Sequence, residues 1–399
     1  MDNLTQKRLN GLRDRLTYIR DIFLGKHADS VKLLQEKLDE FTDKANRGLL
    51  QNPYAEESSL EDLFKYVEDR LTKTLTPMEK VRIVRHPQRI CLKDILENVY
   101  DNFTEVGGQD EHSLDPSMLI ARAVIIRRRG KKRYTQSVMV IGQEKGHGAE
   151  FRNGGSVKPW GNAKARQFMR VAETEGIPVH TYIFTPGSYP IEDYPGAAQQ
   201  IARNIYGMAG LRVPVVSVLL GEGGSGGALA IAVADTVMML QYSTYSVISP
   251  EGCASILFKD AGQAPRAAEA LALTAPRLSQ LGLVDRVLSE PLGGAHRDPK
   301  LMATTLKKAL VDELRVLMKH DMPTLLARRA ERLEGYGRFE RLAEEVPEPE
   351  APAAPEAQPD AKADPCDCSC AKKAAQAAKS VKARPAAEEA KAAEAEKAE

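Results

Sequence analysis

The chain has 399 residues, 43% of them hydrophobic, so it exceeds one typical domain and has enough apolar side chains for a core. Its 56 basic and 55 acidic side chains leave a net charge of +1, which argues against a nucleic-acid partner. Residues 1–8 open no signal region, and no segment reaches the roughly 18 apolar residues of a membrane span, so a cytoplasmic protein without membrane contact is expected.

Residues 1–115 are expected to form a helical region ahead of the main domain. Apolar side chains recur there at steps of three and four residues, which predicts amphipathic helices. Two stripes show this spacing: Leu9, Leu12, Leu16, Ile19 and Phe23, followed by Leu34, Leu38 and Phe41. The helices either pack against each other as a hairpin or dock on another subunit, and the sequence leaves both interpretations open.

A β-hairpin and several buried strands are predicted to follow. Apolar residues 118–127 and 134–142 flank the basic run 128–133, which would form a solvated tip or contact phosphate groups or an acidic partner. The buried strands are predicted at residues 138–141, 179–184, 215–220, 237–240 and 245–248, and helices at residues 163–172, 197–208 and 265–273. This alternation of strands and helices predicts an α/β fold.

Residues 221–230, Gly-Glu-Gly-Gly-Ser-Gly-Gly-Ala-Leu-Ala, are the most informative segment of the chain. They lie between the predicted strand 213–220 and residues 228–234, which are predicted to begin a helix. Without β-carbons a ligand can approach the peptide N–H groups closely, and unpaired N–H groups at a helix N-terminus attract an oxyanion. The segment therefore predicts a binding site built from main chain.

Three short motifs overlap in this segment, and each lacks part of its required context. Gly221 opens a G-x-G-x-x-G pattern, but residues 241–242 hold no acidic side chain at the distance of about 20 residues that a dinucleotide site needs. The G-x-S-x-G pattern around Ser225 has no acid–histidine pair with recognisable context after it. Residues 226–228 supply no P-loop lysine. A loop that only lets the helix pack on the strand stays open as the alternative.

From about Val346 the composition changes to Ala, Pro, Glu and Lys, so residues 337–399 are expected to be a linker and a disordered tail. The tail contains three alternating cysteines, Cys366, Cys368 and Cys370. They could chelate a soft metal, but zinc sites normally pair C-x-x-C with a second cluster, so no metal is expected in this chain. Cys91 and Cys253 lie in apolar segments and are predicted to be buried thiols.

Longer strings of residues point to one family. From about residue 80 to 336, the chain closely resembles the carboxyltransferase alpha subunit of bacterial multisubunit acetyl-CoA carboxylase. The matching strings are residues 219–231 and 239–257, Arg85-His-Pro-Gln-Arg89, Thr185-Pro-Gly187, Ile201-Ala-Arg-Asn204, Ala275-Pro-Arg-Leu278 and Glu290-Pro-Leu-Gly-Gly-Ala-His-Arg297. The resemblance implies a crotonase-like fold over residues 116–336, in which right-handed turns of strand, strand and helix stack into a spiral.

The resemblance also implies partners. The family's alpha subunit pairs with a zinc-bearing beta subunit, as an alpha2beta2 heterotetramer, and residues 1–115 would serve that docking. A biotin carboxyl carrier protein would bring carboxybiotin, and biotin carboxylase would use ATP on another chain. The implied product is malonyl-CoA for fatty acid synthesis.

The implied reaction moves CO2 from the ureido nitrogen of carboxybiotin to the α-carbon of acetyl-CoA. Negative charge develops on the ureido oxygen and on the thioester enolate, and each oxygen needs preorganised donors. By resemblance, the N–H groups of Gly226 and Gly227 form the hole for the biotin carbonyl, with a helix from Ala228 behind them. The beta subunit would supply most of the enolate hole. The freed biotin nitrogen would take the α-proton itself, so no acid–base side chain is required.

Further residues are expected near carboxybiotin or the substrate: Gly187, Ser188, Tyr189, Gly223, Gly224, Ser225, Ser249, Glu251 and Gly252. Simpler roles remain open for several polar side chains. Ser249 has the pattern of a helix N-cap, Ser225 could bond its own turn, and Glu222 could orient the loop or face solvent. His86 and His296 are expected to be hydrogen-bonded loop residues.

Two segments depart from the family pattern. Residues 184–200 are shorter and differ in sequence, and Gln143-Glu144-Lys145-Gly146 stands where the family has His-Gln-Lys-Gly, followed by a less basic stretch over residues 148–160. These changes leave two alternatives open. One is a carboxyltransferase or biotin-dependent decarboxylase subunit acting on another acyl-CoA, and the other is a non-catalytic scaffold paired with the beta subunit.

Overall fold

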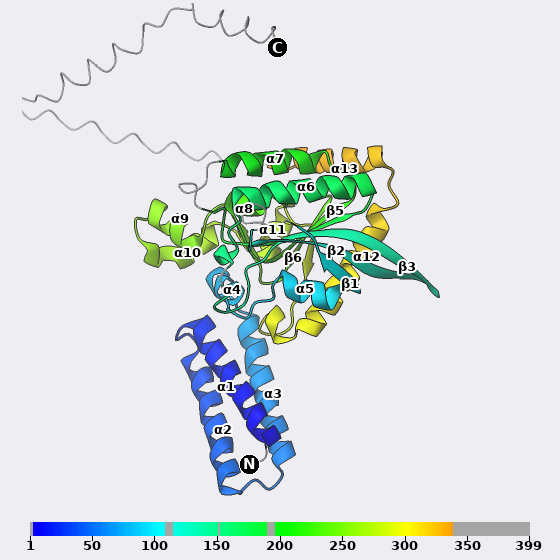
Figure 1. Ribbon diagram of the computed structural model, residues 1–399. Coiled ribbons are helices and arrows are strands. Elements are labelled where there is room, and N and C mark those ends of the chain that lie inside the picture. The colour runs from blue at the N-terminus through cyan, green and yellow to red at the C-terminus, as the bar shows by residue number, and fades with distance from the viewer. Residues whose placement is uncertain (1–2, 108–114, 151, 190–195, 338–399) are drawn as a thin grey trace, which may run out of the picture. The chain divides into compact units, whose positions relative to one another are not determined.

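A mixed β-sheet forms the centre of the fold (Figure 1). This computed structural model describes residues 3–107, 115–150, 152–189 and 196–337, and within them eight strands share one sheet with the order β1-β2-β3-β4-β5-β6-β8, while β7 pairs with β5. The strands are β1 (Asn102–Glu105), β2 (Met118–Arg129), β3 (Lys132–Gln143), β4 (Val179–Thr185), β5 (Val215–Gly224), β6 (Thr236–Leu240), β7 (Thr244–Ser246) and β8 (Arg286–Leu288). The first three are antiparallel and the rest pair in parallel.

The predicted strands form because their apolar side chains are buried on both faces of the sheet. In β5, Val215 and Leu219 belong to one core, whereas Val216, Val218 and Leu220 belong to the other. Side chains alternate between the faces of a strand, and parallel strands covered on both faces read as continuous apolar runs. The α/β class and the first four predicted strands are confirmed. The last one is shorter than predicted, since β7 ends at Ser246.

Helices cover both faces of this sheet (Figure 1). One core joins the sheet to α6 (Pro159–Glu175), α7 (Ala197–Ala209), α8 (Ser225–Leu229) and α11 (Ala275–Gln280). The other core joins it to α5 (Leu92–Val99) and α12 (Pro299–Leu317). The remaining helices of this domain are α4 (Pro77–Val84), α9 (Pro250–Leu257), α10 (Ala264–Ala270) and α13 (Met322–Glu334). No helix in the described ranges is long and apolar enough to cross a membrane.

The first three helices share a core, which also includes Ile83 of α4 and Tyr242. They are α1 (Asn3–Phe23), α2 (Ala28–Arg47) and α3 (Pro53–Thr72). The two predicted apolar stripes are buried here against α3, around the fully buried Phe64. Of the two interpretations that the sequence left open, the structure shows packing of these stripes within the chain. Docking of this region on another subunit would have to use other side chains.

The predicted hairpin is confirmed as β2 and β3, but the predicted helix after the glycines is wrong in its bounds. Strand β5 continues through Gly224, because Gly223 pairs with Thr185 of β4 and with Tyr245 of β7. Helix α8 then begins at Ser225 rather than Ala228 and ends at Leu229. After Leu229 the chain continues in tighter turns, in which the N–H groups of Ile231 and Ala232 donate to the carbonyl oxygens three residues earlier.

Candidate functional site

The junction of β5 and α8 contains the predicted main-chain site. Ser225 begins the helix with a φ of 51°, in the left-handed region, so the chain turns sharply there. Gly224 stands at the N-cap position and supplies no capping side chain. Gly226 and Gly227 lie in the first helical turn, whose N–H groups have no intrahelical acceptor. The junction therefore presents donors at the positive end of a short helix, as the sequence predicts.

The glycines differ in what they do for this junction. A β-carbon on Gly224 would lie 2.1 Å from the carbonyl oxygen of Pro186, and one on Gly227 would lie 2.7 Å from the main chain of Gly187. A β-carbon on Gly226 would meet only the Ile201 side chain, at an ordinary distance of 3.5 Å. Gly224 and Gly227 are thus required by close packing of main chain on main chain, whereas Gly226 is not.

A tight turn after β4 provides the other side of this packing. The hydroxyl group of Thr185 donates to the carbonyl oxygen of Gly187 (2.7 Å) and accepts from the N–H of the same residue (3.1 Å). The predicted site residues Gly187 and Ser188 both lie against Gly227. Tyr189 is tied elsewhere, since its N–H donates to the carbonyl oxygen of Val157 (3.4 Å). The structure therefore brings together Gly187, Ser188, Gly224 and Gly227.

Gln143 is a member of the site that the sequence reasoning noted only as a departure from the family pattern. Its amide NH2 donates to the carbonyl oxygen of Gly227 (2.7 Å), and its amide oxygen accepts from the N–H of Phe184 (3.1 Å). The side chain is fully buried. One signal could have found it: Gln143 directly follows the predicted strand at residues 134–142, and the carboxyl ends of neighbouring parallel strands meet at one edge of a sheet.

A network of charges holds the segment before the turn. Arg85, the residue that follows α4, donates from Nε to Glu222 (2.7 Å) and from Nη1 to Glu251 (2.7 Å), and Lys145 lies 3.6 Å from Glu222. Burial lowers the pKa of Arg85, but its two carboxylate partners more than offset this and raise it overall. Burial likewise raises the pKa of Glu251, and the Arg85 hydrogen bond lowers it below its ordinary value. The alternative in which Glu222 faces solvent is wrong, because its side chain is 12% exposed.

The predicted N-cap at Ser249 is confirmed. Its hydroxyl oxygen accepts from the N–H of Gly252 (3.1 Å), and Pro250 occupies the first turn of α9. Glu251 lies in the same turn and reaches the glycine segment only through Arg85. These three predicted site residues therefore belong to the supporting network of the junction.

Arg89 holds β5 just before the glycine segment. Its guanidinium group donates from Nε (3.0 Å) and Nη2 (2.8 Å) to the carbonyl oxygen of Leu220 and pairs with Glu290, and both side chains of this pair are almost fully buried. Glu290 also accepts from the N–H groups of Tyr242 (2.9 Å) and Ala295 (2.7 Å). The pair thus joins the segments around Arg89, Tyr242 and Glu290 next to β5, the strand that carries the glycines.

The two candidate loop histidines differ. His86 accepts from the N–H of Gln88 (3.1 Å), as predicted. The prediction for His296 is wrong: both of its ring nitrogens are buried without a hydrogen-bond partner among the described residues, and the ring stacks on His86 with centroids 4.5 Å apart. Burial, with smaller effects from neighbouring His86 and arginines, lowers the pKa of His296 to about 3. The predicted burial of Cys91 and Cys253 is confirmed.

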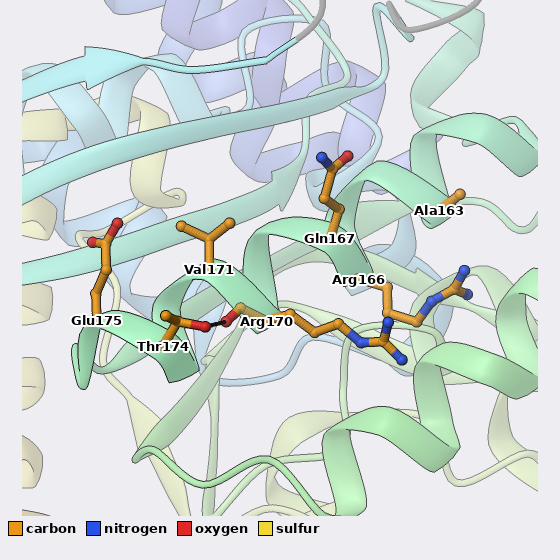
Figure 2. A pocket seen from close by; sticks show the side chains of 7 residues that line it. All are labelled: Ala163, Arg166, Gln167, Arg170, Val171, Thr174 and Glu175. Atoms are coloured by element: carbon orange, nitrogen blue, oxygen red, sulfur yellow. Dashed lines mark hydrogen bonds between the residues drawn. The ribbon is translucent and has the colours of Figure 1, made fainter.

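Surface pockets lie elsewhere on the domain. The pocket of Figure 2 is lined by residues of α6, and the guanidinium groups of Arg166 and Arg170 extend to the same side of that helix. Burial and the charges of Arg203 and Arg170 lower the pKa of Arg166. A second pocket lies between α6 and α7. Neither contains a predicted site residue, so pocket shape by itself would not have selected the glycine junction.

The junction can offer hydrogen-bond donors to an anion. Within the described part of the chain, no hydrogen bond joins Ser225 to a histidine, so the serine has no visible activating base. Electrostatic stabilisation by preorganised N–H groups is the chemistry that this geometry supports. The three tail cysteines Cys366, Cys368 and Cys370 lie outside the described residues.

Comparison with known proteins identifies the family to which the sequence is similar. Residues 26–337 match the family described as "Acetyl co-enzyme A carboxylase carboxyltransferase-like". The acetyl-coenzyme A carboxylase carboxyl transferase subunit alpha of Bordetella avium is 48% identical over 274 residues, 67% of this chain and 83% of that protein. The subunit of the same name from Paraburkholderia phymatum is 47% identical over 304 residues, 72% of this chain and 91% of that protein. Among solved structures, transcarboxylase 12S aligns with a TM-score of 0.45 and 18% identity, over 64% of this chain and 43% of that chain.

Proposed function

The chain belongs to the acetyl co-enzyme A carboxylase carboxyltransferase-like family, and from this we propose that it is the alpha subunit of a carboxyltransferase that makes malonyl-CoA. In this function a carboxyl group passes from carboxybiotin, carried on a separate protein, to acetyl-CoA. The observation that carries the proposal is the glycine turn at the N-terminus of α8, packed against the main chain of residues 186–188.

The N–H groups of Gly226 and Gly227 would hold the ureido oxygen of biotin as it gains negative charge. Donors already fixed in place need no reorganisation when the charge develops, and removing one such donor typically costs a factor of 100 to 1000 in rate, roughly 3–4 kcal/mol. The amide NH2 of Gln143 holds Gly227 by donating to the Gly227 carbonyl oxygen, and Gly187 and Ser188 pack against Gly227. These residues would act by positioning the two donors.

The neighbouring residues Gly223, Gly224 and Ser225 would form the wall of the carboxybiotin site, with Tyr189 near its entrance. Arg85 would keep this wall in place, because it ties Glu222 of β5 to Glu251 of α9. The enolate of acetyl-CoA would be stabilised mainly by a zinc-bearing beta subunit, and no metal is needed in this chain for the transfer.

The proposal includes the assembly. The chain would work in a cytoplasmic alpha2beta2 heterotetramer with the beta subunit, a biotin carboxyl carrier protein and biotin carboxylase. The relatives from Bordetella avium and Paraburkholderia phymatum carry the name of an alpha subunit, which supports a partnered protein.

Two substitutions at one position test the main-chain donor. Gly226→Pro removes the N–H group, whereas Gly226→Ala keeps it and adds a methyl group in ordinary contact with the Ile201 side chain. We measure malonyl-CoA decarboxylation with biocytin as acceptor, using the chain purified with its beta partner. The proline variant is expected to lose a factor of about 100 to 1000 in kcat, and the alanine variant less than about tenfold.

Assembly with the beta subunit and thermal unfolding are measured for both variants, because proline beside the left-handed Ser225 strains the turn. Equal kcat for the two folded variants would remove the proposed role of the N–H group. No turnover by the unaltered complex, with stable pairing, would favour a scaffold, and turnover only with another thioester would favour a different acyl-CoA.

A further inference from the structure

Three metal-ligand side chains meet outside the glycine junction. Cys91 precedes α5, Asp94 lies in the first turn of that helix, and His147 follows β3. One ligand atom from each lies within 4.8 Å of the others, and the Asp94 carboxylate is 2.8 Å from Nε2 of His147. We propose that Cys91, Asp94 and His147 bind one zinc ion, with water at the fourth position.

The main chain around these side chains is fixed by hydrogen bonds. The Asp94 carboxylate accepts from the N–H of Cys91 (2.7 Å), and the Cys91 thiol lies 3.3 Å from the carbonyl oxygen of Gly146. The N–H of Gly148 donates to the carbonyl oxygen of Pro87 (3.1 Å). The two segments that carry the ligands are therefore held together by the protein itself, and a metal ion would need only small side-chain movements.

The three ligand types suit zinc. Thiolate, imidazole and carboxylate are its usual protein ligands, at distances that place ligand atoms of one tetrahedral site roughly 3–4 Å apart. Three protein ligands leave one position for water. The ring atom of His147 that faces Asp94 is Nε2, so zinc would replace the hydrogen bond between these two side chains.

The charges also balance for a divalent cation. Binding replaces the thiol proton of Cys91, which passes to solvent, by a sulfur–zinc bond. The thiolate and the Asp94 carboxylate then carry two negative charges, which the zinc ion neutralises.

The zinc ion would stabilise the segment that supports the glycine junction. The segment of residues 143–147 contains the ligand His147 and two residues that contact the junction. Gln143 donates to the carbonyl oxygen of Gly227, and Lys145 lies beside Glu222. The metal would act there by positioning. This inference does not depend on which thioester the protein uses.

The test uses the full chain with the three tail cysteines, Cys366, Cys368 and Cys370, replaced by serine, so that they cannot supply the metal site. Zinc is added, excess is removed by dialysis, and metal content is measured. Cobalt is then used as a spectroscopic probe. We expect one metal ion per chain and a thiolate-to-cobalt charge-transfer band. Both signals are expected to be lost in Cys91→Ser and in His147→Gln. The His147 side chain is 37% exposed, so its replacement leaves the core intact.

The matched control is Cys253→Ser, which alters the other buried cysteine of the described residues and is expected to keep both signals. Circular dichroism of the metal-free variants checks their folding. The proposal is wrong if the chain with serines in the tail binds no metal. It is also wrong if His147→Gln, folded, keeps the full metal content, which would mean an adventitious ion only.

Discussion

The carbonyl oxygen of Gly227 accepts a hydrogen bond from the buried amide of Gln143, and this contact fixes a residue whose N–H group the proposed site uses. The same amide accepts from Phe184, so one side chain joins the ends of β3 and β4 to the first turn of α8. A buried side chain with both partners satisfied is rigid, and rigidity is what a preorganised donor requires. Gln143 is thus a positioning residue.

Replacing Gln143 with Glu keeps the shape of the side chain but removes its NH2 donor. The buried carbonyl group of Gly227 then faces a carboxylate, and an unpaired buried group costs at least about 1–3 kcal/mol, with more expected for a charged one. The free energy of unfolding in urea is expected to fall by that amount, and kcat of the complex is expected to fall with it. Gln167→Glu, on the exposed side of α6, is the control and should change neither quantity. An unchanged kcat in Q143E would contradict the positioning role.

At the scale of elements, β5 holds the site because other segments fix it at both ends of the glycine run. Strands β4 and β7 pair with its last residues, and Arg89 bonds the carbonyl oxygen of Leu220 just before Gly221. Arg89 reaches this position from the connection between α4 and α5. The strand therefore depends on a segment that lies about 130 residues earlier in the chain.

Arg89→Met tests this support. The substitution leaves the Glu290 carboxylate buried without its partner, and breaking a buried ion pair in this way typically costs about 3–5 kcal/mol. The free energy of unfolding is measured in urea. The double variant Arg89→Met, Glu290→Gln should be more stable than Arg89→Met alone, because it removes the unpaired charge. Equal stability of the two variants would show that the charge pair does not support the strand.

At the scale of the whole molecule, buried histidines make stability depend on pH. Burial lowers the pKa of His180 and of His296 to about 3. An unfolded histidine titrates near 6.5, so the unfolded chain binds more protons below that pH. The stability from these two groups is therefore complete above about pH 6.5 and is lost as the pH falls from 6.5 toward 3.

The expected loss at pH 5.5, one unit below the unfolded pKa, is about 1.4 kcal/mol for each histidine relative to pH 7.5. His296→Phe keeps a ring stacked on His86 and should reduce the pH effect on the urea unfolding free energy by about that amount. His320→Gln changes a half-buried histidine that follows the end of α12 and serves as the control. An identical pH effect in H296F and the unaltered chain would contradict this account.

The amino-acid sequence by itself determined strands β2 to β7, helices α6, α7 and α10, the two apolar stripes of α1 and α2, the glycine segment and the family. These features depend on local periodicity and on unbroken strings of residues, which are visible without knowing which segments meet. The N-cap at Ser249 and the burial of Cys91 and Cys253 were predictable for the same reason.

Only the tertiary structure decided where α8 begins, which glycines are required, and what holds them. Strand β5 extends to Gly224 because β4 and β7 pair with it, and Gly227 is required because the turn at Gly187 lies against it. Gln143 contacts Gly227, which lies 84 positions later in the chain, and Arg85 contacts Glu222, which lies 137 positions later. Such contacts depend on how strands and helices meet in space, and local sequence does not encode that meeting.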